Sequence, residues 1–276
     1  MKRVILYWII AFIVTAVSAV YQRMTGPTYP MSGKVHLGAT PVSYKLLRSQ
    51  GGTEDALVSI PVDDSIVSGV VEWKRLNSDD DWSALPMMRT GALLETRLPH
   101  QPPAGKLEYR VLLTKGEQRV VLPEEGVAVI RYKGDVPTLI LVIHVFAMFG
   151  AMLLSTRTGL EFFNPDPHFK RLMYWTIAFL AFGGLVMGPI VQKYAFDAYW
   201  TGWPFGSDLT DNKTFLGLVG WVVALLALKR SQSPRIWALG ASIFLFIIYL
   251  IPHSVLGSEI DYRKLDQPTR VSETNK

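Results

Sequence analysis

The sequence contains no cysteine and comparatively few charged residues. The absence of cysteine excludes disulfide bonds, thiolate metal sites, a lipidated cysteine and the C-x-x-C-H attachment of a c-type haem. Charged residues make up 18% of the 276 residues and hydrophobic residues 49%, whereas soluble proteins carry about 25% charged residues. The composition therefore argues against a wholly soluble or disordered chain.

Motifs of the common enzyme classes are also missing. The sequence has no G-x-S-x-G, no P-loop, no H-E-x-x-H and no dinucleotide-binding fingerprint. Its net charge is +5, but most of the basic residues lie beside hydrophobic runs and they form no patch. We therefore expect no nucleic-acid partner, and the sequence favours a protein that is not an enzyme.

Long apolar runs are the dominant feature. Each is close to the roughly 20 residues that cross a bilayer core, and a segment in lipid must be helical because lipid offers no partner to a free backbone group. The runs are Val4–Val20, Val136–Leu154, Leu172–Val191, Thr214–Leu228 and Ile236–Pro252. They predict a membrane α-helical bundle of about five transmembrane helices, four of them in a domain spanning residues 136–257.

The first apolar run has two interpretations. Lys2 and Arg3 before it, with the small residues Ser18 and Ala19 near its end, would suit a cleaved signal peptide. The length of the run favours an uncleaved N-terminal anchor over residues 1–24. Both interpretations place residue 25 onward across the membrane.

Short loops indicate the orientation. Eight basic residues fall before the first run and in the loops after the second and fourth runs, against Glu161 and Asp166 alone. An excess of Lys and Arg marks cytoplasmic loops. We therefore expect a multi-pass protein of the plasma (inner) membrane of a bacterium. Its N-terminus would be cytoplasmic, and residues 25–135, the loop 192–213 and the polar tail 258–276 extracytoplasmic.

Residues 25–135 have a different pattern, of short apolar–polar alternations separated by turn residues. Alternation is clearest over residues 107–113, where Leu107, Tyr109, Val111 and Leu113 would share one face. About seven short strands in a hundred residues predict an antiparallel β-sandwich. The expected strands are Val35–Leu37 with Ser43–Leu47, Ala56–Pro61, Val70–Leu76, Leu93–Leu98, Leu107–Thr114, Gln118–Leu122 and Val127–Tyr132.

The stretch from Leu98 to Tyr109 resembles the E–F corner of fibronectin-III and immunoglobulin-like domains. In those domains a tyrosine near the start of strand F sends its hydroxyl back across the corner. The resemblance implies an extracytoplasmic all-β immunoglobulin-like sandwich inserted between helices 1 and 2, with Trp73 as the core aromatic. It implies a fold and a binding or positioning role, without an activity.

The loop 192–213 is rich in aromatic residues. Six aromatic side chains fall within residues 194–205, among them Tyr199, Trp200 and Trp203. They could form an ordinary aromatic belt at the lipid headgroups, or an apolar platform for a flat ligand. Asp208 and Asp211 follow; they could act as an acid–base pair or bind a divalent cation, although Asp211 or Asn212 would also cap the next helix.

Two histidines lie at the same expected level as this loop. His144 falls in the second run and His253 at the end of the fifth. An ionisable residue inside a span is a candidate functional residue, although either histidine could be structural. Met148 and Met152 follow His144 on one helix face, where thioethers could ligate haem iron or Cu(I) or simply fill the core.

Two outer histidines around a Tyr-Trp-x-x-Trp loop resemble the tryptophan-rich haem-handling proteins of cytochrome c maturation. That family holds haem on an external Trp-rich loop between two external histidines. The resemblance implies a platform of Tyr199, Trp200 and Trp203 and axial ligands from His144 and His253. The family's Trp-Asp-Pro core is absent, because Trp203 is followed directly by Pro204.

Two hypotheses on function follow. The first is haem binding, or less favourably quinone or copper binding, at the outer face in respiratory or cytochrome maturation chemistry. The second is a non-enzymatic assembly or scaffold subunit whose β-sandwich holds another membrane or periplasmic protein. A transporter is disfavoured, because no inverted repeat or pair of broken helices is evident.

Overall fold

A computed structural model describes the chain except for residues 1, 229, 253, 254, 256 and 267–276. The chain divides into two compact units. The helical unit consists of Met1–Pro27 and Asp135–Ser258, and the β unit of Thr28–Gly134 and Glu259–Lys276. His253, one of the two predicted haem ligands, lies outside the described residues.

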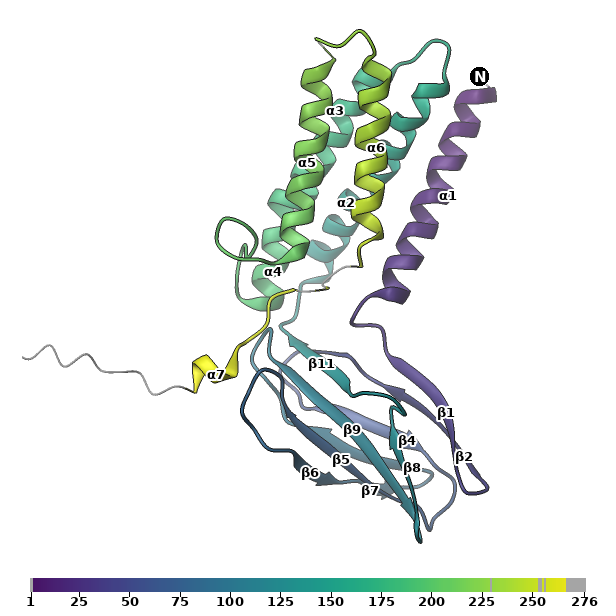
Figure 1. Ribbon diagram of the computed structural model, residues 1–276, viewed down its shortest axis with the longest axis vertical. Coiled ribbons are helices and arrows are strands. Elements are labelled where there is room, and N and C mark those ends of the chain that lie inside the picture. Colours follow the sequence, from purple (N-terminus) through teal and green to yellow (C-terminus); the bar gives the residue numbers. More distant parts are fainter. Residues whose placement is uncertain (1, 229, 253–254, 256, 267–276) are drawn as a thin grey trace, which may run out of the picture. The chain divides into compact units, whose positions relative to one another are not determined.

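The helical unit is a bundle of long apolar helices (Figure 1). A 3₁₀ turn extends its second helix, and a π-helical segment joins the third helix to the fourth. In chain order the elements are α1 (Lys2–Thr25), α2 (Thr138–Leu160), η1 (Glu161–Phe163), α3 (Phe169–Leu180), η2 (Ala181–Met187), α4 (Gly188–Phe196), α5 (Leu209–Ala227) and α6 (Pro234–Leu250).

Four segments are long and apolar enough to cross a membrane: Lys2–Thr25, Thr138–Phe163, Phe169–Phe196 and Leu209–Ala227. The sequence predicts five. The fifth run forms α6, which is apolar but has only 17 residues, fewer than the roughly 20 that span a bilayer core.

Small residues let the helices of this unit approach closely. A Cβ atom on Gly184 would collide with Thr214 of α5, and one on Gly217 would lie 2.8 Å from Leu245 of α6. Trp221, whose side chain is fully buried, belongs to the core of this unit. The Gln22 side chain donates to the Tyr249 carbonyl oxygen and so joins α1 to α6.

The β unit has eleven described strands. They agree closely with the expected strand positions, and three short strands, β3, β6 and β7, were not expected. The strands are β1 (Met31–Leu37), β2 (Thr40–Leu46), β3 (Ser49–Gly51), β4 (Ala56–Pro61), β5 (Ser68–Arg75), β6 (Ser83–Pro86), β7 (Met88–Thr90), β8 (Leu93–Leu98), β9 (Lys106–Lys115), β10 (Gln118–Leu122) and β11 (Ala128–Lys133).

Strand β9 is the centre of the β unit. Its four alternating residues from Leu107 to Leu113 are fully buried, as the apolar–polar pattern predicts. One edge of β9 pairs with β5, while β10 and β11 pair with successive parts of the other edge.

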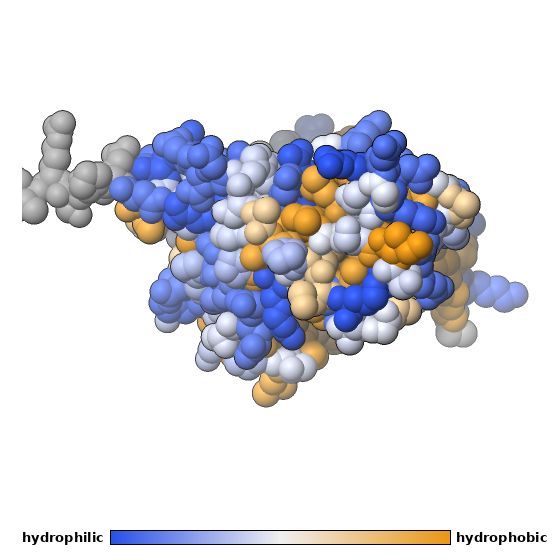
Figure 2. Space-filling view, turned by 90° about the horizontal axis from the view of Figure 1, so that it is seen from below, coloured by the Kyte–Doolittle hydropathy of each residue, from blue (hydrophilic) through white to orange (hydrophobic). Residues whose placement is uncertain are grey.

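Figure 2 views the molecule from below and shows hydrophobic groups scattered among hydrophilic ones on that face.

The strand order in the sheets of the β unit differs from that of an immunoglobulin-like sandwich. The strands form three sheets, of six, three and two strands, and β11 pairs in parallel with β3. The Tyr109 hydroxyl donates to the Leu47 carbonyl oxygen at 2.7 Å, outside the Leu98–Lys106 corner to which the resemblance assigned it. Trp73 is only partly buried and lies at the margin of the core. Local alternation places residues on a face, but it does not determine which strands pair.

The first part of the predicted polar tail belongs to the β unit. Tyr262, in the short helix α7 (Tyr262–Leu265), donates its hydroxyl hydrogen to Gln101 Oε1 at 2.9 Å. Glu259 pairs with Lys106 at 2.6 Å, and Asp266 pairs with Arg75 at 2.5 Å. Residues 259–266 are therefore joined to this unit by side-chain contacts.

Candidate functional site

The candidate site is the end of the helical unit at which α4 passes into α5. Helix α4 stops at Asp197, whose φ of 59° places it in the left-handed region. Asn and Asp tolerate this conformation better than most residues, because their short side chains bond locally. Helix α5 then begins at Asp208, which accepts a hydrogen bond from the Thr210 backbone N–H at 2.7 Å. The helix cap is thus Asp208, and the prediction of Asp211 or Asn212 is wrong.

A buried polar cluster fixes the course of this loop. Asp211 Oδ2 accepts hydrogen bonds from the backbone N–H groups of Thr201 at 2.8 Å and Gly202 at 2.9 Å. When the amide of Gln192 is oriented with nitrogen toward Asp211, it donates to Oδ1 at 3.0 Å and accepts from Thr201 Oγ1 at 2.6 Å. A buried carboxylate is retained only where such donors replace water.

Asp208 also accepts hydrogen bonds, from Ser258 in the segment that follows α6. Its Oδ2 accepts from the backbone N–H of Ser258 at 2.8 Å and from the Ser258 hydroxyl at 3.0 Å. Burial raises the pKa of Asp208, but the donors from Ser258 and Thr210 outweigh it and hold the pKa below its usual value. Ser258 Oγ also lies 2.8 Å from Thr201 Oγ1, which closes the cluster.

Lys213 completes the cluster from α5. Its side chain is 7% exposed, and Nζ donates to the Ile251 carbonyl oxygen at 2.8 Å. This bond satisfies a carbonyl at the end of α6, where helical carbonyls lack partners. Within the part of the chain that the structure describes, no three His, Asp or Glu side chains are grouped to hold a metal ion. The bonds of Asp208 and Asp211 favour a structural role over acid–base or cation-binding chemistry.

The cluster supports a set of exposed aromatic rings. Tyr199, Trp203 and Phe205 are 62%, 67% and 82% exposed. The Trp203 backbone N–H donates to Asn212 Oδ1, and Trp200 Nε1 donates to the Trp203 carbonyl oxygen at 3.1 Å. The rings therefore project from a backbone that is held in place by hydrogen bonds, and the geometry is compatible with both the belt and the platform interpretations.

His144 lies on α2 and faces the π-helical segment η2. Its Nδ1 is 3.0 Å from the Gly183 carbonyl oxygen. Since a carbonyl can only accept, Nδ1 carries a hydrogen, and in the neutral imidazole Nε2 then has the free lone pair. π-Helical turns are rare and occur frequently at functional sites, because they redirect backbone groups.

The methionines after His144 have a packing role in the structure. Met148 Sδ would lie 2.9 Å from a Cβ atom on Gly183, so it occupies the space that the glycine leaves. Met152 is fully buried in the helical core. No hydrogen bond or ring contact between described residues joins His144 to Tyr199, Trp200 or Trp203.

Sequence reasoning missed two parts of this unit. Gln192, Thr201 and Ser258 gave no signal, because each meets its carboxylate partner only after folding. Arg157 and Glu161 were assigned to a cytoplasmic loop, but α2 and η1 include both, and they form a buried ion pair. Their spacing of four residues at the end of an apolar run was the available signal.

No protein-family model, curated protein or solved structure matches the chain.

Proposed function

We propose that the chain is an integral membrane protein of the bacterial envelope that binds haem beside the loop 192–213. In this proposal the N-terminus is cytoplasmic, and the β unit and the loop 192–213 face the periplasm. The four apolar segments support membrane insertion, and the distribution of basic residues over the short loops supports the orientation.

The observation that carries the haem proposal is the hydrogen bond between His144 Nδ1 and the Gly183 carbonyl oxygen, 3.0 Å long. Histidine ligands in metal sites commonly donate their second ring nitrogen to a carbonyl or carboxylate, which fixes the tautomer and the ring plane. His144 has this arrangement, and in the proposal its Nε2 would coordinate iron.

The other predicted residues have subordinate parts in the proposal. Tyr199, Trp200 and Trp203 would form an apolar platform for haem, His253 would supply a second ligand to the iron, and Met148 would help to bind the group. Bound haem would supply one-electron redox chemistry or be passed to a partner. The protein's own contribution is to orient His144 and to hold the aromatic rings on a fixed backbone.

An absorption spectrum of the protein purified in mild detergent, oxidised and then reduced, tests this proposal. We expect a Soret band that is lost in His144→Gly and recovered when imidazole is added. His168→Gly is the matched control, because His168 is an exposed histidine of the same unit, and its Nδ1 lies 3.1 Å from the Asp166 carbonyl oxygen. A protein that carries no haem and does not bind added haem would refute the proposal.

The assembly-subunit alternative is favoured by a different observation, in the β unit. Ile66 and Met88 are 72% and 71% exposed. Their segments are joined by Arg89, whose guanidinium donates to the carbonyl oxygens of Val62, Asp64 and Val67 at 2.6–3.0 Å. Two exposed apolar side chains on a braced surface could anchor a partner protein.

Site-specific photo-crosslinking in intact membranes separates the two proposals. An assembly subunit should give one discrete adduct from position 66 or 88 and none from the exposed control position Glu124. Equal labelling from all three positions would argue against a partner surface there, whatever the result of the haem measurement.

A further inference from the structure

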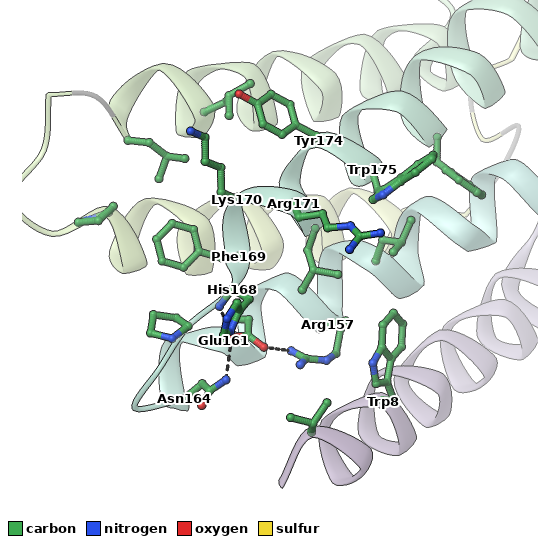
Figure 3. Close-up of a pocket in the computed structure, with 18 of the residues that line it drawn as sticks. Trp8, Arg157, Glu161, Asn164, His168, Phe169, Lys170, Arg171, Tyr174 and Trp175 are labelled. Atoms are coloured by element: carbon green, nitrogen blue, oxygen red, sulfur yellow. Dashed lines mark hydrogen bonds and ion pairs between the residues drawn. The ribbon is translucent and has the colours of Figure 1, made fainter. Parts of the chain in front are cut away.

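The end of the helical unit that contains Arg157 has an open cavity of about 1380 Å³ (Figure 3). It lies between α1, α2 and α3 and reaches the adjoining ends of α5 and α6. Drug-sized ligands occupy about 300–1,000 Å³, so this cavity has room for the headgroup of a lipid and part of an acyl chain.

The wall of the cavity is largely apolar and aromatic. Side chains from α1, α2, α3 and α5 contribute to it, and Figure 3 shows Trp8 and Trp175 on either side of the space that Arg157 and Arg171 enter. The apolar lining includes Trp8, Leu154, Leu172, Trp175, Phe179 and Leu225. An acyl chain complements this lining better than a fully polar ligand does, because an apolar wall offers no hydrogen-bond partners to polar groups.

Arg157 is the buried charge of the cavity. Its side chain is 4% exposed, and Nη1 pairs with Glu161 Oε1 at 2.5 Å. Its guanidinium carbon lies 5.5 Å from the ring centres of Tyr7 and Trp8, and its Nε has no hydrogen-bond partner among the described residues. Glu161 is more fully engaged, since its Oε2 accepts from Asn164 Nδ2 at 2.9 Å and from the His168 backbone N–H at 2.8 Å.

The cavity has a positive balance of charge. Arg157 and Glu161 cancel each other, and Glu161 is the only acid among the lining residues described. Lys170 and Arg171 are exposed lining residues that form no ion pair with any described residue. Two unpaired cations above an apolar wall complement a ligand with an anionic head and an apolar tail.

We propose that this cavity binds a phospholipid with an anionic headgroup. The phosphate would lie at Arg171, with Lys170 contributing through its charge, and the acyl chain would follow the wall between Trp8 and Trp175. Basic pockets between helices on the cytoplasmic side of a membrane are known to recognise such headgroups. The inference rests on the proposed insertion and orientation of the protein, but it is independent of haem.

Native mass spectrometry of the full chain in detergent, titrated with phosphatidylglycerol, tests the proposal. Phosphatidylcholine of the same acyl chains is the control lipid, and inorganic phosphate tests the headgroup chemistry alone. We expect phosphatidylglycerol to bind tighter than phosphatidylcholine and to be displaced little by millimolar phosphate. Arg171→Gln should weaken phosphatidylglycerol binding about fivefold.

Arg230→Gln is the matched control variant, because Arg230 is an exposed arginine of the α5–α6 loop and does not line the cavity. Lys170→Gln is a second test variant, in case Arg171→Gln fails to fold. Equal binding of the two lipids, or equal weakening by Arg171→Gln and Arg230→Gln, would overturn the proposal. If millimolar phosphate displaces phosphatidylglycerol, the proposal of a lipid ligand is wrong, and the cavity binds a free phosphate compound instead.

Extraction of the membranes with alkaline carbonate separates this failure from failure of the membrane assignment. If the protein stays with the membrane pellet and shows no lipid preference, the lipid inference alone is wrong. If the protein is extracted, both the membrane assignment and the inference that rests on it fall.

Discussion

The two ends of the helical unit hold their buried charges in different ways. At the end formed by α4 and α5, Asp208 and Asp211 accept hydrogen bonds from backbone N–H groups and from Ser258. At the other end Arg157 and Glu161 pair with each other. The carboxylates of the first end accept hydrogen bonds from uncharged donors of the loop and of Ser258. Glu161 divides its two oxygens between the Arg157 guanidinium and uncharged donors from Asn164 and His168. The first end is therefore built as a rigid loop, and the second can border an open cavity.

The largest effect is expected at the Arg157–Glu161 pair. Glu161→Ala leaves the Arg157 guanidinium buried without its counter-charge, and loss of one partner of a buried pair costs about 3–5 kcal/mol. Unfolding of the purified protein by added denaturing detergent would measure this loss. Replacing both residues by Met and Leu should recover most of the stability, and a double variant as unstable as Glu161→Ala would contradict the explanation.

A smaller effect is expected at the rigid loop. Asp211→Ala leaves the buried N–H groups of Thr201 and Gly202 without an acceptor, at a cost of about 2 kcal/mol. Amide hydrogen exchange should rise in peptides that contain residues 201 and 202. Asp211→Asn is the control, because its side-chain oxygen can still accept. Unchanged exchange in Asp211→Ala would show that the loop does not depend on this carboxylate.

The smallest effect is expected in the pH dependence of folding stability. The pKa of Asp208 is lowered in the folded protein, so its contribution to stability is complete above the unfolded value of about 3.9. The contribution is then lost as the pH falls through the lower folded value. Unfolding midpoints measured from pH 7 to pH 3 should fall less steeply in Asp208→Asn. Parallel curves would show that Asp208 does not contribute to the acid dependence.

The sequence predicted local structure well. Apolar runs located α1, α2, α3 with α4, and α5, and period-two alternation located β9 with its buried Leu107 and Tyr109. These patterns succeed because burial of one face is decided within a few residues of the chain. The aromatic residues of the loop between α4 and α5 were visible for the same reason.

Long-range pairing could not be predicted in this way. Ser258 meets Asp208 across 50 residues, and the Tyr109 hydroxyl meets the Leu47 carbonyl across 62. Neither serine nor a carbonyl has a local pattern that indicates its partner. The arrangement of the strands in three sheets depends on such pairings, and it differs from the immunoglobulin-like sandwich that the sequence led us to expect.

The contacts of Glu259, Tyr262 and Asp266 with the β unit have a consequence for the order of synthesis. Their partners, Lys106, Gln101 and Arg75, leave the ribosome more than a hundred residues earlier. The β unit must therefore remain incomplete while the whole helical bundle is made, and its final contacts form only after α6 has emerged. The β unit can therefore be complete only when translation has passed α6.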